Sequence, residues 1–312
     1  MRLGVVFPGQ GSQSVGMGGA LVEVSPIAAD LFRRAERVLG YDLRALIADG
    51  PEDKLRETMY AQPAIFVTNY ALAAAAGELP VVASAGHSFG EYCSLTLAGA
   101  LEFEQALTLV RERGLAMQRA AELAPGAMAA VLGLDPSAVR AAAEAARDCG
   151  RVRLANFNAP GQIVVSGDAA AVARAGELAL EAGAKRVVAL NVSGAWHSEL
   201  MEPARERFAP FVERAAIGLP RFTVISNVDA EPYRDVAGIR ANLIRSVCDE
   251  VLWHATAERL VAEGLDAIVE FGGSAVLGPL LKRLAGAPPA THVGDERGLA
   301  KLGATPAASA AG

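Results

Sequence analysis

The sequence predicts a mixed α/β fold, in which a large domain built on a parallel sheet is interrupted by a smaller α+β subdomain. Three observations predict it. With 312 residues, the chain is longer than a typical single domain. Over most of its length, short apolar runs that end at glycine-rich loops alternate with helical periodicity. Between residues 125 and 192 the order becomes strand, helix, strand, strand, helix, strand, which is the ferredoxin-like arrangement.

These patterns set the expected domain boundaries. The large domain should comprise residues 1–124 and 193–302, and the ferredoxin-like subdomain residues 125–192. Residues 303–312, rich in alanine with proline and serine, are expected to form a disordered tail.

The elements expected before the subdomain begin with a buried strand. Short apolar runs predict strands at residues 3–7 and 81–86. Helical periodicity predicts helices at residues 26–48, 51–76, 91–97 and 101–121. Pro63 should break the second of these helices in two, because proline lacks the amide proton that a helix interior needs.

Apolar runs and helical periodicity also predict the elements of the subdomain and of the second part of the large domain. Within the subdomain, the expected strands and helices are residues 127–134, 136–147, 152–156, 162–166, 169–182 and 185–192. After it, we expect a helix from residue 199, strands at 223–227 and 267–271, and helices at 236–246, 252–263 and 276–284.

Composition indicates a packed core and excludes several classes of partner. Apolar residues make up 52% of the chain and charged residues 21%, with a net charge of −6. No basic surface for nucleic acid or anionic membranes is expected. Three cysteines without C-x-x-C spacing predict neither a disulfide framework nor a metal site. Without a signal sequence or an apolar run long enough to span a membrane, we expect a cytoplasmic protein.

One stretch predicts nucleophilic chemistry. An apolar run ends at Gly86, and Gly86-His87-Ser88-Phe89-Gly90 leads into a helical pattern. Gly-x-Ser-x-Gly between a strand and a helix is the nucleophile elbow of α/β-hydrolases, so the large domain should be α/β-hydrolase-like. The turn strains the serine backbone, and its glycines let the chain cross closely. Ser88 is therefore the predicted nucleophile.

Two other features leave alternatives open. The Gly-rich loop at residues 8–13 lacks a P-loop ending; it is either an ordinary turn or a source of a backbone N–H aimed at Ser88. On the helix at residues 101–121, Arg113 falls about 70° from the centre of the apolar stripe, slightly closer than Arg111 at about 90°. A half-buried guanidinium needs an anion, which is either a protein carboxylate or a substrate carboxylate.

A nucleophilic serine needs a general base, usually histidine, and the chain has four. His87 adjoins the nucleophile and points away from it, and His254 lies in a helical pattern. His292 stands near the chain end, where an α/β-hydrolase histidine would stand, but no HGGG-type oxyanion loop accompanies it. His197 lies in a glycine-containing loop between a strand and a helix, which favours it over His292.

A series of motifs, in constant order from residue 3 to about residue 285, resembles one family, the malonyl-CoA:acyl carrier protein transacylases. The motifs are Phe7-Pro8-Gly9-Gln10-Gly11-Ser12-Gln13, Gly86-His87-Ser88-Phe89-Gly90-Glu91-Tyr92, Arg113-Gly114 with Met117-Gln118, Asn158-Ala159-Pro160-Gly161-Gln162, Gly194-Ala195-Trp196-His197-Ser198, Ile225-Ser226-Asn227 and Val269-Glu270-Phe271-Gly272.

The resemblance implies a role for each matching residue. Ser88 would be the nucleophile and His197 its base. Arg113 would bind the free carboxylate of the malonyl group. The backbone N–H groups of Gln10 and Phe89 would form the oxyanion hole.

Three more residues receive a role from the resemblance. A backbone carbonyl before a tryptophan would orient the histidine, here that of Leu252 before Trp253. Trp196 and His87 would line the acyl pocket.

The resemblance also implies the reaction and its partners. Malonyl-CoA would acylate Ser88, and the phosphopantetheine thiol of an acyl carrier protein would then take the malonyl group, in fatty-acid or polyketide synthesis. No permanently bound cofactor or metal and a monomeric enzyme are implied.

Departures from the family pattern concern the substrate. Trp196 stands where malonyl-specific relatives commonly carry phenylalanine; it should crowd a 2-alkyl branch or shape a pocket for another malonyl-type unit. Phe89 replaces the more common leucine. Gly272-Gly273-Ser274-Ala275 replaces Gly-Pro-Gly-Lys and removes a positive charge. The alternative function is a proofreading acyl-thioester hydrolase of a polyketide pathway, against which Arg113 argues.

Overall fold

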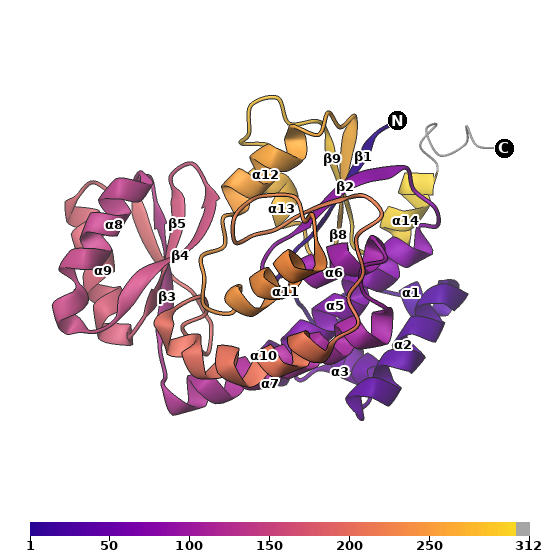
Figure 1. Cartoon of the computed structure of the whole chain (residues 1–312), viewed down its shortest axis with the longest axis horizontal. Coiled ribbons are helices and arrows are strands. Elements are labelled where there is room, and N and C mark those ends of the chain that lie inside the picture. Colours follow the sequence, from indigo (N-terminus) through magenta and orange to yellow (C-terminus); the bar gives the residue numbers. More distant parts are fainter. Residues whose placement is uncertain (304–312) are drawn as a thin grey trace.

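The computed structural model describes residues 1–303 and has the expected two-part α/β architecture (Figure 1). The predicted tail lies, from residue 304 onward, outside the described residues. The first part of the large domain contains β1 (Leu3–Phe7), α1 (Leu21–Val24), α2 (Pro26–Leu39), α3 (Leu43–Asp49), α4 (Glu52–Arg56), α5 (Thr58–Ala75), β2 (Val81–Gly86), α6 (Gly90–Leu97) and α7 (Phe103–Leu123).

The chain then builds the small subdomain and returns. The subdomain contains β3 (Ala127–Leu132), α8 (Pro136–Ala145), the 3-10 helix η1 (Arg147–Cys149), β4 (Val152–Ala159), β5 (Gln162–Gly167), α9 (Ala169–Glu181) and β6 (Arg186–Ala189). The returning part contains the 3-10 helix η2 (Glu199–Met201), α10 (Glu202–Arg214), β7 (Thr223–Ile225), α11 (Val236–Arg245), α12 (Trp253–Val261), β8 (Ala267–Phe271), α13 (Leu277–Leu281), β9 (Ala290–Val293) and α14 (Glu296–Gly303).

The large sheet is parallel and has the strand order β7-β2-β1-β8-β9. Its central strand β1 is buried along its whole length, as the continuous apolar run predicted. Because parallel strands end at the same edge, the loops after β1, β2 and β7 come together at one edge of the sheet. That edge carries the Gly-rich loop at residues 8–13 and the turn at residues 86–90 that contains Ser88, here called the nucleophile turn.

The small sheet is antiparallel, with the order β4-β5-β3-β6. Helices α8 and α9 cover the face that points away from the large domain (Figure 1). The subdomain buries a hydrophobic cluster of its own, which includes Val131, Leu154, Ile163 and Val172. This is the ferredoxin-like arrangement that the split βαβ order predicted.

Hydrogen bonds fasten the subdomain to the large domain beside the nucleophile turn. Val251 N donates to the Ala155 carbonyl at 2.8 Å, and Phe157 N donates to the Val251 carbonyl at 2.9 Å. The Arg283 guanidinium, just after α13, donates to the Pro160 carbonyl at 2.6 Å and to Gln162 Oε1 at 2.8 Å. The β4–β5 hairpin is therefore held at a fixed position near Ser88.

Several element boundaries differ from the sequence prediction. The helix expected at 26–48 is two helices, because Gly40 adopts a left-handed φ of 78° that ends α2. Pro63 does not break a helix: α5 continues through it, and the interruption lies earlier, at the extended residue Glu57. The sequence prediction also missed β9 and α14 at the end of the described chain.

The nucleophile turn crosses the end of β1 at van der Waals distance. A Cβ built on Gly86 would lie 1.9 Å from the Gly90 carbonyl carbon, and one built on Gly90 would lie 2.4 Å from the Phe7 carbonyl oxygen. Both clashes are with backbone atoms, which no side-chain rearrangement relieves. These two glycines are therefore required by the fold.

We predict that Gly86→Ala lowers the free energy of unfolding by about 3 kcal/mol or prevents folding, because the added methyl group displaces the backbone at Gly90. Gly218→Ala is the matched control, since the nearest atom to its added Cβ would be 3.9 Å away. Denaturant unfolding of both variants measures the difference. Wild-type stability of Gly86→Ala would contradict the close crossing.

Candidate active site

Ser88 occupies the turn between β2 and α6 with a left-handed φ of 52°. A serine adopts this conformation rarely, and strained backbones of this kind cluster at functional sites. Its Oγ lies 2.9 Å from His197 Nε2. The structure thus places the predicted nucleophile within hydrogen-bond distance of His197, the histidine that the sequence favoured.

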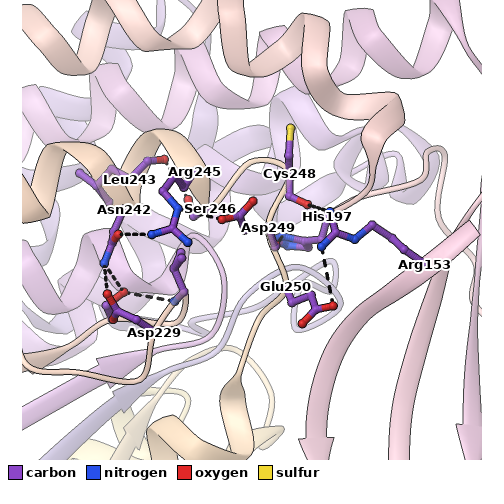
Figure 2. A network of polar contacts seen from close by, with 12 residues as sticks. Arg153, His197, Asp229, Asn242, Leu243, Arg245, Ser246, Cys248, Asp249 and Glu250 are labelled. Atoms are coloured by element: carbon purple, nitrogen blue, oxygen red, sulfur yellow. Dashed lines mark hydrogen bonds and ion pairs between the residues drawn. The ribbon is translucent and has the colours of Figure 1, made fainter. Parts of the chain in front are cut away.

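His197 lies in the loop between β6 and η2, is 4% exposed and also has a positive φ, 59°. Its Nδ1 is 3.0 Å from the Asp249 carbonyl oxygen, in the loop between α11 and α12 (Figure 2). A carbonyl oxygen accepts hydrogen bonds and does not donate, so Nδ1 carries the proton. Nε2 is then free to accept the proton of Ser88.

The carbonyl that orients His197 is therefore that of Asp249, and the expected Leu252 is corrected. The Leu252 carbonyl instead accepts from Thr256 N at 2.8 Å, and the Leu252 N–H donates to the Asn227 carbonyl at 2.9 Å. The loop changes direction between Asp249 and Leu252. The carbonyl that contacts His197 therefore belongs to a residue three positions before the predicted one. Arg245 donates to the Asp249 carboxylate at 2.9 Å and braces this loop (Figure 2).

The surroundings of His197 keep its imidazole neutral. Burial is the main cause, and the positive charge of Arg113 adds to it; together they lower the pKa of His197 from 6.5 to about 3. A neutral imidazole is the form that accepts a proton. His197 is thus in its basic form at neutral pH.

Arg113, on α7, is 1% exposed and points into the site. Its Nη1 donates to Gln62 Oε1 at 2.8 Å, and its Nη2 lies 3.3 Å from Ser88 Oγ. Its Nε has no hydrogen-bond partner, and the guanidinium has no ion pair within the described part of the chain. A buried cation beside Ser88, with no carboxylate of the described residues in direct contact, can bind an anionic group of a ligand.

Two residues that the sequence analysis missed connect Arg113 to the Gly-rich loop. Gln62 Nε2 donates to Thr58 Oγ1 at 3.0 Å, and Thr58 Oγ1 donates to Gln10 Oε1 at 2.8 Å. Thr58 and Gln62 are completely buried on α5. Their signal in the sequence was polar residues within a helix that is otherwise apolar.

The backbone N–H groups of Gln10 and Phe89 flank Ser88 from two different loops. Gln10 and Phe89 line the same cavity as Ser88, and among residues 1–303 neither N–H has a hydrogen-bond acceptor. Phe89 also precedes the first turn of α6, where N–H groups point out of the helix. Two such donors can stabilise an oxyanion on a carbonyl attacked by Ser88.

The site opens into a cavity of about 360 Å³ between the two domains. The subdomain and the loop after it supply an apolar wall that includes Met128, Val164, Leu190 and Trp196. Trp196 is 5% exposed, and its indole Nε1 has no partner in the described part of the chain. The cavity is large enough for an acyl group with part of its carrier.

The other histidines lie in different surroundings. His87 lines the cavity and contacts Asn158 Oδ1 through Nε2 at 2.9 Å, and burial lowers its pKa. His292, on β9, contacts the Gly272 carbonyl at 2.7 Å. His254 contacts the carboxylate of Glu258 on α12. The structure places neither His292 nor His254 in the cavity beside Ser88.

Within residues 1–303, no cluster of three or more histidine, cysteine, aspartate or glutamate side chains is arranged to hold a metal ion. In the same range, no helix combines the length and the hydropathy that crossing a membrane requires.

Comparisons with known proteins identify the family. Residues 5–283 match the family model described as acyl transferase domain. The chain is 40% identical over 298 residues to the malonyl CoA-acyl carrier protein transacylase of Haemophilus influenzae, covering 94% of this chain and 96% of that protein. It is 41% identical over 282 residues to the polyketide biosynthesis protein ThaF of Burkholderia thailandensis, covering 89% of this chain and 24% of that protein.

A solved structure shows the same fold. It is a malonyl-transacylase in complex with a type II PKS acyl-carrier protein, with a TM-score of 0.92 and 38% identity, and the match covers 97% of this chain and 99% of that chain.

We predict that acid inactivates Ser88 far below the usual titration range of histidine, because the pKa of His197 is about 3. Phosphonylation of Ser88 by a phosphonofluoridate should keep a constant rate from pH 8 down to about pH 5 and fall below it. Protonation of His197 is less favourable in the folded than in the unfolded state. The free energy of unfolding should therefore also decrease as pH falls from 6.5 toward 3. A rate that is halved between pH 6 and 7 would contradict the neutral buried base.

Proposed function

The chain belongs to the acyl transferase domain family and is an acyltransferase, and from that premise we propose that it transfers a malonyl group from malonyl-CoA to the phosphopantetheine thiol of an acyl carrier protein, for fatty-acid or polyketide synthesis. The observation that carries the proposal is Arg113: a buried guanidinium 3.3 Å from the Ser88 hydroxyl that forms no direct ion pair with a carboxylate among the described residues. An acyl group with a free carboxylate at its far end fits this arrangement.

In the first half-reaction, Ser88 Oγ attacks the thioester carbonyl while His197 Nε2 takes its proton. The N–H groups of Gln10 and Phe89 bind the resulting oxyanion. When the tetrahedral intermediate collapses, the carbon–sulfur bond breaks, and the CoA sulfur leaves with the proton from His197. The product is a malonyl ester on Ser88, with its carboxylate bound by Arg113.

In the second half-reaction, the carrier's thiol attacks the ester carbonyl, again with His197 as base and the same two N–H donors. Ser88 leaves and recovers its proton from His197, and the malonyl group is then a thioester of the carrier. The acyl group is held at one end by its ester bond to Ser88 and at the other by Arg113, which favours attack by the bound thiol. All residues with a role come from one chain, and we propose a monomeric enzyme without a resident cofactor.

The cavity wall bears on the choice of acyl unit. Trp196 directly precedes His197 in the sequence and is buried. Its ring packs so closely against Gly194 that a Cβ on that residue would clash with it. A rigid indole at this position crowds a branch on carbon 2 of the malonyl group. We therefore propose malonyl as the preferred unit over 2-substituted malonyl groups.

We predict that the enzyme, incubated with malonyl-CoA and phosphopantetheinylated carrier protein, yields malonyl-carrier, detected by its increased mass. With malonyl-CoA alone, the same mass should appear on the peptide containing Ser88. Ser88→Ala should abolish both products. Free malonate together with an unmodified carrier would instead indicate the thioester hydrolase.

We predict that Arg113→Ala lowers kcat/KM for malonyl transfer by about 100-fold or more, because the substrate carboxylate loses its charged partner. Transfer of an uncharged acetyl group should be retained or improved. Arg111→Ala is the matched control on the same helix, since Arg111 contacts Glu112 and the Val38 carbonyl outside the cavity. Equal losses for malonyl and acetyl groups would argue against carboxylate binding by Arg113.

A further inference from the structure

Two backbone groups of the nucleophile turn are satisfied by a side chain from a distant segment. Asn227, two residues after β7, donates from Nδ2 to the Gly86 carbonyl at 2.6 Å. Its Oδ1 accepts from the Ser88 N–H at 2.7 Å. The amide therefore spans the two peptide groups on either side of His87.

These two hydrogen bonds of the Asn227 side chain take the place of the backbone bonds that a longer β7 would make to β2. The last paired residue of β7 is Ile225, opposite Ala85 of β2. In a parallel sheet, one residue would bond to the residues before and after its partner on the next strand. The Asn227 side chain makes the equivalent two bonds beyond the end of β7, while Ser88 leaves the strand conformation with φ of 52°.

Asn227 is itself held from several directions. It is 1% exposed, and its N–H donates to Glu91 Oε2 at 3.1 Å. Glu91 is buried on α6, and its other carboxylate oxygen accepts a hydrogen bond from the Tyr233 hydroxyl. The amide therefore has little freedom to move away from the turn.

The main chain of Asn227 reaches the other member of the catalytic pair. Its carbonyl accepts from Leu252 N at 2.9 Å. Leu252 ends the loop in which the Asp249 carbonyl orients His197. One residue thus contacts both the segment that carries the nucleophile and the loop that orients the base.

We propose that Asn227 is a positioning residue for Ser88: its side-chain amide holds the serine backbone in the left-handed conformation that directs Oγ to His197 and the Phe89 N–H to the oxyanion. The proposal rests on the nucleophilic role of Ser88 in the proposed function. Without the amide, the Gly86 carbonyl and the Ser88 N–H lose their partners and the turn relaxes. A displacement of about 1 Å at a reacting atom lowers rates by about 100-fold.

The test is single-turnover acylation of Ser88 in Asn227→Ala, measured at increasing malonyl-CoA concentrations. We expect the limiting rate to fall about 100-fold and the half-saturating concentration to change less than about threefold, because no contact with the substrate is lost. Asn227→Asp is the isosteric variant, which keeps an acceptor for the Ser88 N–H and loses the donor to the Gly86 carbonyl. Its limiting rate should fall at least about tenfold.

Asn242→Ala is the matched control. Its buried amide donates to Ser226 Oγ at 3.0 Å and to Asp229 Oδ2 at 2.8 Å, bracing the same loop without contacting the nucleophile turn (Figure 2). This variant should melt at a lower temperature and acylate at a rate within about threefold of wild type.

A second probe separates this proposal from the proposed function. Phosphonofluoridate reacts with Ser88 by forming an Oγ–P bond and releasing fluoride, while His197 takes the proton, and the reaction requires no malonyl group. If wild type reacts with this probe and not with malonyl-CoA, the proposed substrate is wrong and the probe alone decides the role of Asn227. Wild-type rates in both Asn227 variants, or the same rate loss in Asn242→Ala, would overturn the positioning role; if Asn227→Ala does not fold, Asn227→Asp decides.

Discussion

The close crossing of two backbone segments beneath Ser88 constrains the whole site. Gly90 lies against the Phe7 carbonyl at the end of β1, and Gly86 lies against the Gly90 backbone, so no side chain separates them. The crossing makes the turn tight, and the two hydrogen bonds of the Asn227 amide act with it at Ser88, which has a left-handed φ of 52°. The nucleophile is thereby fixed to the most buried element of the large domain, and the base and the cation are arranged around it.

The sequence was sufficient to predict the parts of this arrangement that depend on residue type. Ser88 was predictable because the glycines that permit the crossing are also its motif. The helical periodicity of α7 placed Arg113 near the buried face, where the structure confirms its burial. The inserted subdomain was predictable because the succession strand, helix, strand, strand, helix, strand along residues 125–192 is typical of a ferredoxin-like unit, and the observed order β4-β5-β3-β6 agrees with it.

The parts that depend on three-dimensional packing were not predictable in the same way. The group that orients His197 is the Asp249 carbonyl, and every residue has such a carbonyl, so residue type gives no signal for it. The path of the loop places this carbonyl, and not that of Leu252, beside His197. Pro63 continues α5 because burial among neighbouring elements outweighs the one hydrogen bond that its missing N–H removes. The sequence favoured His197 over His292 from its loop position and the family motif, but the 2.9 Å distance between Ser88 Oγ and His197 Nε2 required coordinates.

The proximity of Arg113 to His197 links the basicity of the imidazole to the charge at the guanidinium. The positive charge of Arg113 contributes to the low pKa of His197, after burial. Once a carboxylate binds Arg113, its negative charge compensates the cation and the imidazole becomes a stronger base. Under the proposed function, an acyl group with a free carboxylate would therefore raise the basicity of His197 as it binds, and a thioester without that charge would not.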